Sequence, residues 1–299
     1  MFEPDVWVSL GFSPCLLVYL LVLWVFVRRR RASPFNNNIY GLFTALGCCD
    51  VGGQLYGSAY RALGFLVGGP PFGDTGALVL FYVYETVLMS AYWLQVAAVA
   101  ANRFTAIAFF PVYDELWHGW RPVVAIAAPI ALSCGLVVAL YAPVLSVGTN
   151  ATTADTFLFP IVDWTAPRAR AAILAETLIM QATNALGLLA YAAALLRLRG
   201  HLGRTLHGRA APPLHAVVRS TSEAATRRRL LRELKLLAIG VSITGLQLLI
   251  FLAFHYPASL GGASLMGLAL SLYFNVNPFL YITIDGQLRQ ALRDTLCGN

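Results

Sequence analysis

The sequence predicts an all-α integral membrane protein, a bundle of seven transmembrane helices with a short amphipathic helix at its C-terminal end. Composition is the first observation: of 299 residues, 58% are hydrophobic and only 12% are charged, whereas soluble domains carry about 25% charged residues. The second is that the apolar residues gather in seven segments of about the 20 residues that cross a bilayer. Lipid is therefore the expected main solvent of this chain.

The seven expected spans follow one another with short connections, so no separate soluble domain is expected. They cover residues 6–27, 38–67, 77–103, 122–145, 169–196, 232–255 and 263–284. Together they form one transmembrane domain, 1–284, followed by a cytoplasmic amphipathic tail, 285–299. The longest connection, 197–231, is rich in glycine and proline and is expected to be irregular. The N-terminus has no basic segment before its apolar stretch, so no cleavable signal peptide is expected.

The arginine distribution predicts the orientation of these spans. Eighteen of the 21 lysine and arginine residues fall on one side of the predicted membrane, and only Arg61, Arg168 and Arg170 fall on the other. Because basic loops stay in the cytoplasm, the N-terminus is expected outside and the C-terminus inside. The Asn-Ala-Thr triplet at Asn150 is a glycosylation acceptor pattern, and this topology places it in an outer loop.

Several classes of protein do not fit the sequence. The net charge of +7 comes from loops between apolar runs, which indicates membrane orientation and not nucleic-acid binding. A membrane zinc enzyme needs about three converging ligands, but four of the five histidines fall in expected cytoplasmic loops and His255 lies alone at an outer end. No metal, no cofactor and no enzymatic activity are therefore expected. A transporter would be indicated by internal repeats, and none is evident.

Arg103 and Glu85 are the most informative ionisable residues inside the third expected span. A charge in hydrocarbon costs at least about 2.5–3.5 kcal/mol and marks a candidate functional site. The two residues are eighteen positions apart, which is five helical turns, so both lie on one face. Arg103 is either a snorkelling residue at the end of the span or a working part of the protein. Glu85 is either a pocket residue or a buried acid bonded to a neighbouring helix.

Polar residues of the second and seventh expected spans form a second candidate site. Asp50 lies halfway along its span, and we expect Asn275 and Asn277 to contact it directly or through water. This group is either a polar contact that locks packing or an ion site. Pro278 follows directly and removes a backbone donor, so the helix is expected to bend there and to carry Tyr281 with it.

The tail is expected to lie on the inner leaflet as an amphipathic helix. Leu288, Leu292 and Leu296 share one face, with arginines beside it. Cys297, at the end of this helix, is a candidate for palmitoylation.

Three features carry a resemblance to a known family: Asp50, Asn102-Arg103-Phe104, and Asn277-Pro278-Phe279-Leu280-Tyr281. On these, the chain resembles the rhodopsin-like seven-helix receptors that couple to G proteins, in which an acid, an Asp-Arg-Tyr motif and an Asn-Pro-x-x-Tyr motif occupy the corresponding places. More narrowly, NRFTAIAFFPVYDELW, residues 102–117, is similar to a stretch of the nematode serpentine chemoreceptors of the Srv and Srg types.

The chain departs from this family in ways that change what is expected of Arg103. Asn102 replaces the acid that normally holds the neighbouring arginine, so that restraint is weakened or moved, and Glu233 is the expected new partner. The ranges 68–80 and 146–168 contain no cysteine, so the usual outer disulfide cannot form. The hinge proline of the sixth span and the proline of the fifth span are missing as well.

The resemblance implies a chemosensory G-protein-coupled receptor of the plasma membrane, including that of sensory cilia. Its partners would be a small extracellular molecule, the lipid bilayer and a heterotrimeric G protein on the cytoplasmic face. The implied activation switch comprises Asn102, Arg103, Phe104, Glu233, Asn277, Pro278 and Tyr281. The alternative is a non-signalling seven-helix membrane protein, either a decoy receptor or a transporter.

A ligand pocket is expected in the outer half of the bundle. Its expected lining residues are Tyr82, Glu85, Met89, Tyr92, Glu176, Gln247 and His255. Aromatic, acidic and thioether groups suit a small, partly apolar ligand, which is cationic if Glu85 is ionised. For any one of these residues, packing is the alternative role.

Overall fold

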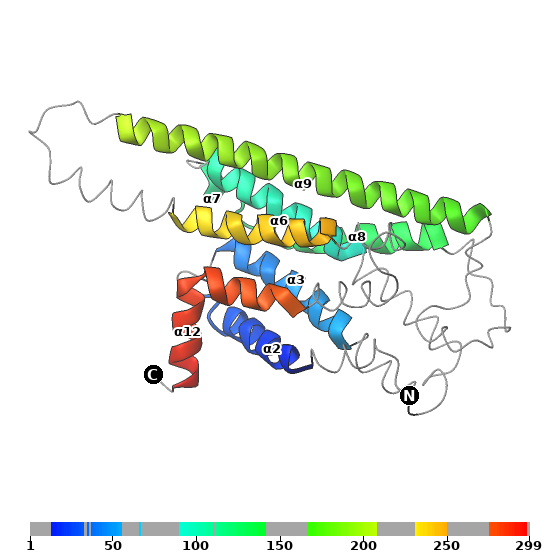
Figure 1. Ribbon diagram of the computed structural model, residues 1–299, viewed down its shortest axis with the longest axis horizontal. Coiled ribbons are helices and arrows are strands. Elements are labelled where there is room, and N and C mark those ends of the chain that lie inside the picture. Colours follow the sequence, from blue (N-terminus) through cyan, green and yellow to red (C-terminus); the bar gives the residue numbers. More distant parts are fainter. Residues whose placement is uncertain are drawn as a thin grey trace, which may run out of the picture.

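The computed structural model describes residues 13–32, 35, 37–55, 66, 90–109, 112–141, 167–207, 231–249 and 275–297. The described residues form helices and no strand, which confirms the all-α class. The helices are α2 (Ser13–Arg28), α3 (Asn38–Gln54), α6 (Ala91–Ala108), α7 (Tyr113–Leu116), α8 (Arg121–Tyr141), α9 (Pro167–His207) and α12 (Gly286–Leu296). Two further helical segments, 231–249 and 275–284, lie between α9 and α12 in the chain (Figure 1).

Two of the described helices are long and apolar enough to cross a membrane. They are Arg121–Leu140 within α8 and Arg170–Gly200 within α9. Both expose large apolar side chains such as Leu132 and Leu186, which is the surface that a helix presents to lipid. The seven-span count stays a prediction, because the other expected spans are described over shorter stretches.

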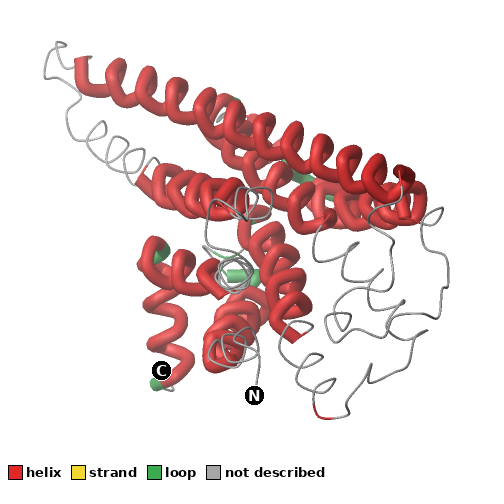
Figure 2. The backbone as a smooth tube through the Cα atoms, turned by 45° about the vertical axis from the view of Figure 1, so that its right-hand side comes forward, coloured by secondary structure: helices red, strands yellow, loops and turns green. Residues whose placement is uncertain are grey.

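Helix α6 lies at the centre of the described structure. It packs against α9, α3 and α8, while α2 packs on α3 and α12 packs on α2 (Figures 1 and 2). Small residues allow the close approach of α6 and α9: a Cβ atom built on Gly187 of α9 would lie 3.8 Å from the Cβ atom of Ala100. Because α6 is central, neighbouring helices surround its residue Arg103.

An aromatic cluster holds α2, α3 and segment 275–284 together. The ring centroids of Phe26 and Tyr40 are 5.4 Å apart, those of Phe35 and Tyr40 are 5.0 Å apart, and those of Phe43 and Tyr281 are 4.8 Å apart. Edge-on and tilted pairs at these separations stabilise packing beyond simple burial. The cluster therefore fixes the ends of three elements next to one another.

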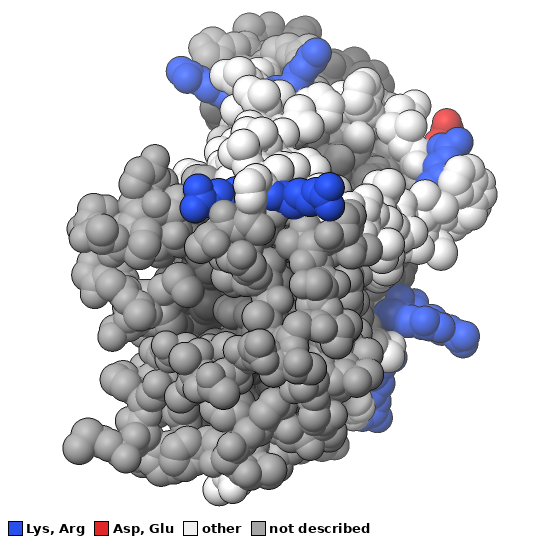
Figure 3. All heavy atoms as spheres, turned by 90° about the vertical axis from the view of Figure 1, so that its right-hand side faces the viewer, with Lys and Arg blue, Asp and Glu red and all other residues white. Residues whose placement is uncertain are grey.

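Side-chain contacts bring the ends of distant segments to one end of the protein. The Asn38 amide at the start of α3 donates to the carbonyl of Trp117 at 2.8 Å, and Arg29 beyond the end of α2 pairs with Asp294 of α12 at 3.5 Å. The described arginines at this end include Arg29 after α2, Arg121 at the start of α8, and Arg289 and Arg293 of α12, all of which were expected on the cytoplasmic side. The opposite end, which holds the start of α9, is seen in Figure 3, where lysine and arginine side chains stand out from a largely uncharged described surface.

Two helices extend beyond their predicted ends. The third span was expected to end at Arg103, but α6 continues to Ala108, because residues 104–108 are apolar or small and Ala106 and Ile107 are buried. The fifth was expected to end at 196, but α9 continues to His207. Leucine and arginine favour helix there, and Leu198 is buried in a cluster with Leu237. The first part of the expected irregular connection is therefore helical.

Candidate functional site

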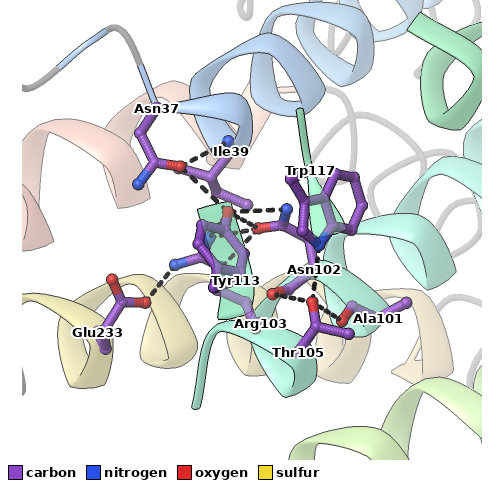
Figure 4. Close-up of polar contacts among 9 residues, drawn as sticks. All are labelled: Asn37, Ile39, Ala101, Asn102, Arg103, Thr105, Tyr113, Trp117 and Glu233. Carbon is purple, nitrogen blue, oxygen red and sulfur yellow. Dashed lines mark hydrogen bonds and ion pairs between the residues drawn. The ribbon is translucent and has the colours of Figure 1, made fainter. Parts of the chain in front are cut away.

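Arg103 is completely buried, with 0% of its surface exposed. Its Nη1 atom lies 2.5 Å from Oε2 of Glu233, which segment 231–249 carries near its start (Figure 4). A snorkelling arginine would extend its guanidinium to headgroups and water. The structure instead turns the guanidinium of Arg103 toward a neighbouring helix, so the snorkelling interpretation does not describe it.

Asn102 also contacts the guanidinium of Arg103. Its Oδ1 atom accepts a hydrogen bond from Nε of Arg103 at 3.2 Å and a second one from Nη2. An amide oxygen carries no full charge, so it orients the guanidinium without neutralising it. Glu233 therefore supplies the charge that pairs with Arg103, and Asn102 adds neutral hydrogen bonds.

Tyr113 of α7 joins this group from the segment that follows α6. Its hydroxyl accepts a hydrogen bond from Nδ2 of Asn102 at 3.0 Å and from Nη2 of Arg103 at 3.4 Å, and it lies 3.3 Å from Oδ1 of Asn37. Burial raises the pKa of the Tyr113 phenol above its usual value, so the hydroxyl stays protonated and able to donate. One hydroxyl therefore links α6 to the residue that precedes α3.

Further contacts fix the connection between α6 and α8. The indole Nε1 of Trp117 donates to the hydroxyl of Thr105 at 2.8 Å, and Gly119 has a positive φ of 67°, which a glycine adopts without strain. Asn37 caps α3, since its side chain accepts from the backbone N–H of Ile39 at 3.1 Å. Figure 4 shows these contacts around the guanidinium of Arg103, which itself binds Glu233, Asn102 and Tyr113.

Tyr191 of α9 packs in a cluster with Ala100 and Ile107 of α6 and Leu237 of segment 231–249. It is buried, and its hydroxyl packs against Gly240 so closely that a Cβ atom at that position would lie 2.2 Å from it. The absence of a side chain at Gly240 is what admits the phenol. Segment 231–249 is therefore fitted to α9 as well as to α6.

The second candidate site is a buried polar group around Asp50. Oδ2 of Asp50 accepts a hydrogen bond from the hydroxyl of Tyr19 and another from Nδ2 of Asn277 at 2.8 Å. The same amide contacts the hydroxyl of Tyr92 at 2.7 Å. Two donors thus meet Oδ2 of Asp50, while its Oδ1 atom has no hydrogen-bond partner among the described residues. These bonds join α2, α3 and segment 275–284, which is the role that the packing interpretation gives to Asp50.

Tyr92 was expected to line the ligand pocket. The structure places its hydroxyl in the Asp50 group, where it contacts Asn277 of segment 275–284, and its ring is completely buried. Asn275, Pro278 and Tyr281 are also buried in that segment. Tyr281 packs in the aromatic cluster, one turn beyond Asn277. These residues connect the Asp50 group to the end of the protein that holds Arg103.

The other expected pocket residues are described only in part. Glu176 is buried, and its Oε1 atom accepts a hydrogen bond from Ser90 at 3.1 Å, while Gln247 is completely buried in segment 231–249. Both therefore project into the protein from their helices. Four further expected pocket residues and the glycosylation acceptor lie outside the described residues: Tyr82, Glu85, Met89, His255 and Asn150.

Phe104 and Cys297 lie at the edges of the site. Phe104 is half-buried and makes an edge-on ring contact with Phe109, at a centroid separation of 6.0 Å. Cys297 is exposed at the C-terminal cap of α12. Leu288 and Leu292 of that helix are buried while Arg289 and Arg293 are exposed, so α12 has the amphipathic form that the sequence predicts.

Sequence reasoning singled out Tyr92 and Tyr281 but missed three other buried tyrosines. Tyr19, Tyr113 and Tyr191 sit in apolar or loop stretches, and neither charge nor spacing distinguishes them from aromatic packing residues. Asp285 was also missed, although an acid directly before a short amphipathic helix is an N-cap signal. Its side chain does accept hydrogen bonds from the backbone N–H groups of Gln287 and Leu288.

Within the part of the chain that the structure describes, no three histidine, cysteine or acidic side chains lie close enough to hold a metal ion. Comparison of the chain with known protein families and with curated proteins finds no match. The geometry of the two buried groups is therefore the main indication of function.

Proposed function

We propose that this chain is a G-protein-coupled receptor: a seven-helix protein of the plasma membrane, with its N-terminus outside, that senses a small extracellular molecule. The observation that supports this proposal most strongly is the buried ion pair between Arg103 and Glu233. It joins α6 to segment 231–249 at the end of the protein where the basic residues gather. That end faces the cytoplasm under the proposed topology.

A buried ion pair suits a switch better than it suits a structural support. Removing two charges from water costs about as much as their attraction returns, so such a pair adds little net stability. The pair does, however, specify one arrangement of the two helices that carry it. When segment 231–249 moves away from α6, Arg103 loses Glu233 and becomes able to bind another acceptor. In this proposal that acceptor belongs to an inserted G protein.

The outer half of the bundle would receive the ligand. Glu176 and Gln247 project inward from α9 and segment 231–249, and the expected residues Tyr82, Glu85, Met89 and His255 complete the proposed pocket. A carboxylate and aromatic groups favour a small, partly apolar cation. Ligand binding between α9 and segment 231–249 would act on the helix that also carries Glu233, which connects the outer and inner ends.

Two modifications follow from the proposed topology. Asn150 would lie outside the cell and carry a glycan, and Cys297, exposed at the end of α12, would carry a palmitoyl chain in the inner leaflet. The buried face of α12 packs on α2, and its arginines are exposed, where they can meet anionic headgroups.

Nucleotide exchange on purified G proteins tests the proposal. The chain, reconstituted in nanodiscs, is mixed with each class of heterotrimeric G protein, and the binding of a labelled GTP analogue is followed. We expect ligand-independent exchange above that with empty nanodiscs for at least one class. Uptake of a small cationic tracer into proteoliposomes, with no exchange for any class, would instead identify a transporter.

A further inference from the structure

A second group of polar contacts lies at the same end of the protein as Arg103. The hydroxyl of Tyr40, in the first turn of α3, donates a hydrogen bond to Oδ2 of Asp285 at 2.6 Å. Arg232 lies one helical turn before Leu236, which packs in the same buried cluster as Tyr40, and its guanidinium acts on the Tyr40 hydroxyl. A guanidinium only donates hydrogen bonds and a carboxylate only accepts them. The hydroxyl of Tyr40, which donates to Asp285, therefore keeps its lone pairs for Arg232, so that it is placed between the two charges.

Asp285 fixes the corner between segment 275–284 and α12. Its other oxygen, Oδ1, accepts from the backbone N–H of Gln287 at 2.9 Å and from that of Leu288 at 3.3 Å, which caps α12. Arg289 reaches back to the carbonyl of Ile282 at 2.9 Å. One carboxylate thus uses one oxygen for the start of α12 and the other for Tyr40.

The aromatic cluster fixes the ring of Tyr40. Phe26 and Phe35 contact it in edge-on geometry, with centroid separations of 5.4 Å and 5.0 Å, and Tyr40 is buried. The ring of Tyr40 is therefore positioned by Phe26 of α2 and by Phe35, which precedes α3. A phenylalanine at position 40 would keep the ring contacts and remove only the hydroxyl.

Arg232 and Glu233 are neighbours at the start of segment 231–249. Successive residues of a helix point about 100° apart, from 3.6 residues per turn, so the two side chains reach different partners. Glu233 binds Arg103 of α6, and Arg232 lies on the face whose Leu236 packs in the cluster of Tyr40 of α3. The first turn of this segment is therefore held on two sides, and it cannot leave α6 while both contacts persist.

We infer that Arg232, Tyr40 and Asp285 form a second restraint, which positions the start of segment 231–249 against α3 and links it to α12. The inference rests on the proposed function, because it concerns the helix whose movement would activate a G protein. It adds a route of regulation: a displacement of α12, which carries Asp285 at its cap, releases Arg232. The seating of α12 on the membrane would thereby bias the Arg103 switch.

Pulsed electron resonance between two spin labels tests this restraint without any signalling assay. The labels are placed at Leu231 and Leu296, which are 49% and 69% exposed, on a full-length chain whose five cysteines are replaced by serine. Tyr40→Phe removes the hydroxyl. Asp285→Asn removes the charge and keeps an N-cap side chain, because asparagine caps as well as aspartate. Helix content by circular dichroism confirms that both variants fold.

The expected result is a longer and broader label distance in both variants. The population ratio of the displaced state should rise about tenfold, as for the loss of one hydrogen bond to a charged group. The double variant should show no larger change than either single variant, because both remove the same connection. Asp114→Asn, which removes an exposed carboxylate of α7 at the same end, should leave the distance unchanged.

The result that would overturn the inference is a wild-type distance distribution in both Tyr40→Phe and Asp285→Asn. Nucleotide exchange measured on the same variants separates this failure from that of the proposed function. If the labels move apart in the variants but no G protein shows nucleotide exchange, the restraint is supported and the proposed receptor function is contradicted. Exchange that rises with Glu233→Gln and is unchanged in both Tyr40→Phe and Asp285→Asn would support the receptor and overturn the restraint.

Discussion

Arg103 and Glu233 are 130 positions apart in the chain, yet their side chains meet at 2.5 Å inside the protein. The contact joins α6, the central helix, to segment 231–249. Neither charge is solvated, since Arg103 is completely buried and Glu233 nearly so. Each charge therefore depends on the other, and a movement of either helix must supply both with new partners.

Replacing Glu233 by glutamine should release this contact. The amide keeps the shape of the side chain and removes its charge, so Arg103 loses a charge-assisted hydrogen bond of about 1.5–3 kcal/mol. We expect ligand-independent nucleotide exchange to rise about tenfold or more. Glu115→Gln, an equal change at an exposed residue of α7, is the matched control and should keep the wild-type rate. Equal rates in the two variants would mean that the ion pair does not restrain the switch.

Replacing Asn102 by aspartate should have the opposite effect. Oδ1 of Asn102 already accepts from Nε of Arg103 at 3.2 Å, so a carboxylate there would add a charge to an existing contact. Charge-assisted hydrogen bonds are roughly twice as strong as neutral ones. Ligand-independent exchange should fall below the wild-type rate, and in the double variant with Glu233→Gln it should fall below the rate of Glu233→Gln alone. A rise in either background would contradict this account of Asn102.

Asp50 should behave as a packing residue and not as a cation ligand. Asp50→Ala leaves the buried donors of Tyr19 and Asn277 without their acceptor, at about 1–3 kcal/mol for each. Asp50→Asn keeps an acceptor oxygen, so it should lower the unfolding temperature in detergent much less. Exchanging sodium for choline at constant ionic strength should leave the wild-type unfolding temperature unchanged. Specific stabilisation by sodium that is lost in Asp50→Asn would instead identify an ion site.

The packing of Tyr191 against segment 231–249 can be tested at a pair of glycines. A methyl group at Gly240 would lie 2.2 Å from the hydroxyl of Tyr191, whereas one at Gly245 meets nothing within 4 Å. Gly240→Ala should therefore destabilise the protein by about 1–3 kcal/mol through overpacking. Gly245→Ala should be neutral or slightly stabilising, since alanine favours helix. Thermal unfolding of both variants decides the point, and equal unfolding temperatures would contradict the close contact.

The sequence predicted the partners of the buried charges better than it predicted helix ends. A charge in an apolar span needs a partner, so Asn275 and Asn277 were expected near Asp50, and Asn277 does contact it. Glu233 was expected beside Arg103 from the resemblance, because Asn102 stands where that family has an acid. The end of α6 was placed at Arg103 because a charge resembles a stop signal, but the arginine has a partner inside the bundle and the helix continues to Ala108.

The tyrosines could not be assigned from the sequence in the same way. Tyr92 was placed in the ligand pocket because it lies on the face of Glu85, yet its hydroxyl turns to Asn277. A phenol packs like an apolar ring and also hydrogen-bonds like a polar group, so only tertiary contacts decide which role dominates. The same holds for Tyr40 and Tyr113, whose hydroxyls connect elements that are distant in the chain.

Arg103 itself provides the most direct test of the proposed receptor. Nucleotide exchange on heterotrimeric G proteins is measured for Arg103→Ala and for Arg170→Ala, an exposed arginine at the opposite end of the protein, after surface expression of both is matched to wild type. The account predicts that exchange is lost in Arg103→Ala and retained in Arg170→Ala. Wild-type exchange by Arg103→Ala at equal surface expression would contradict it.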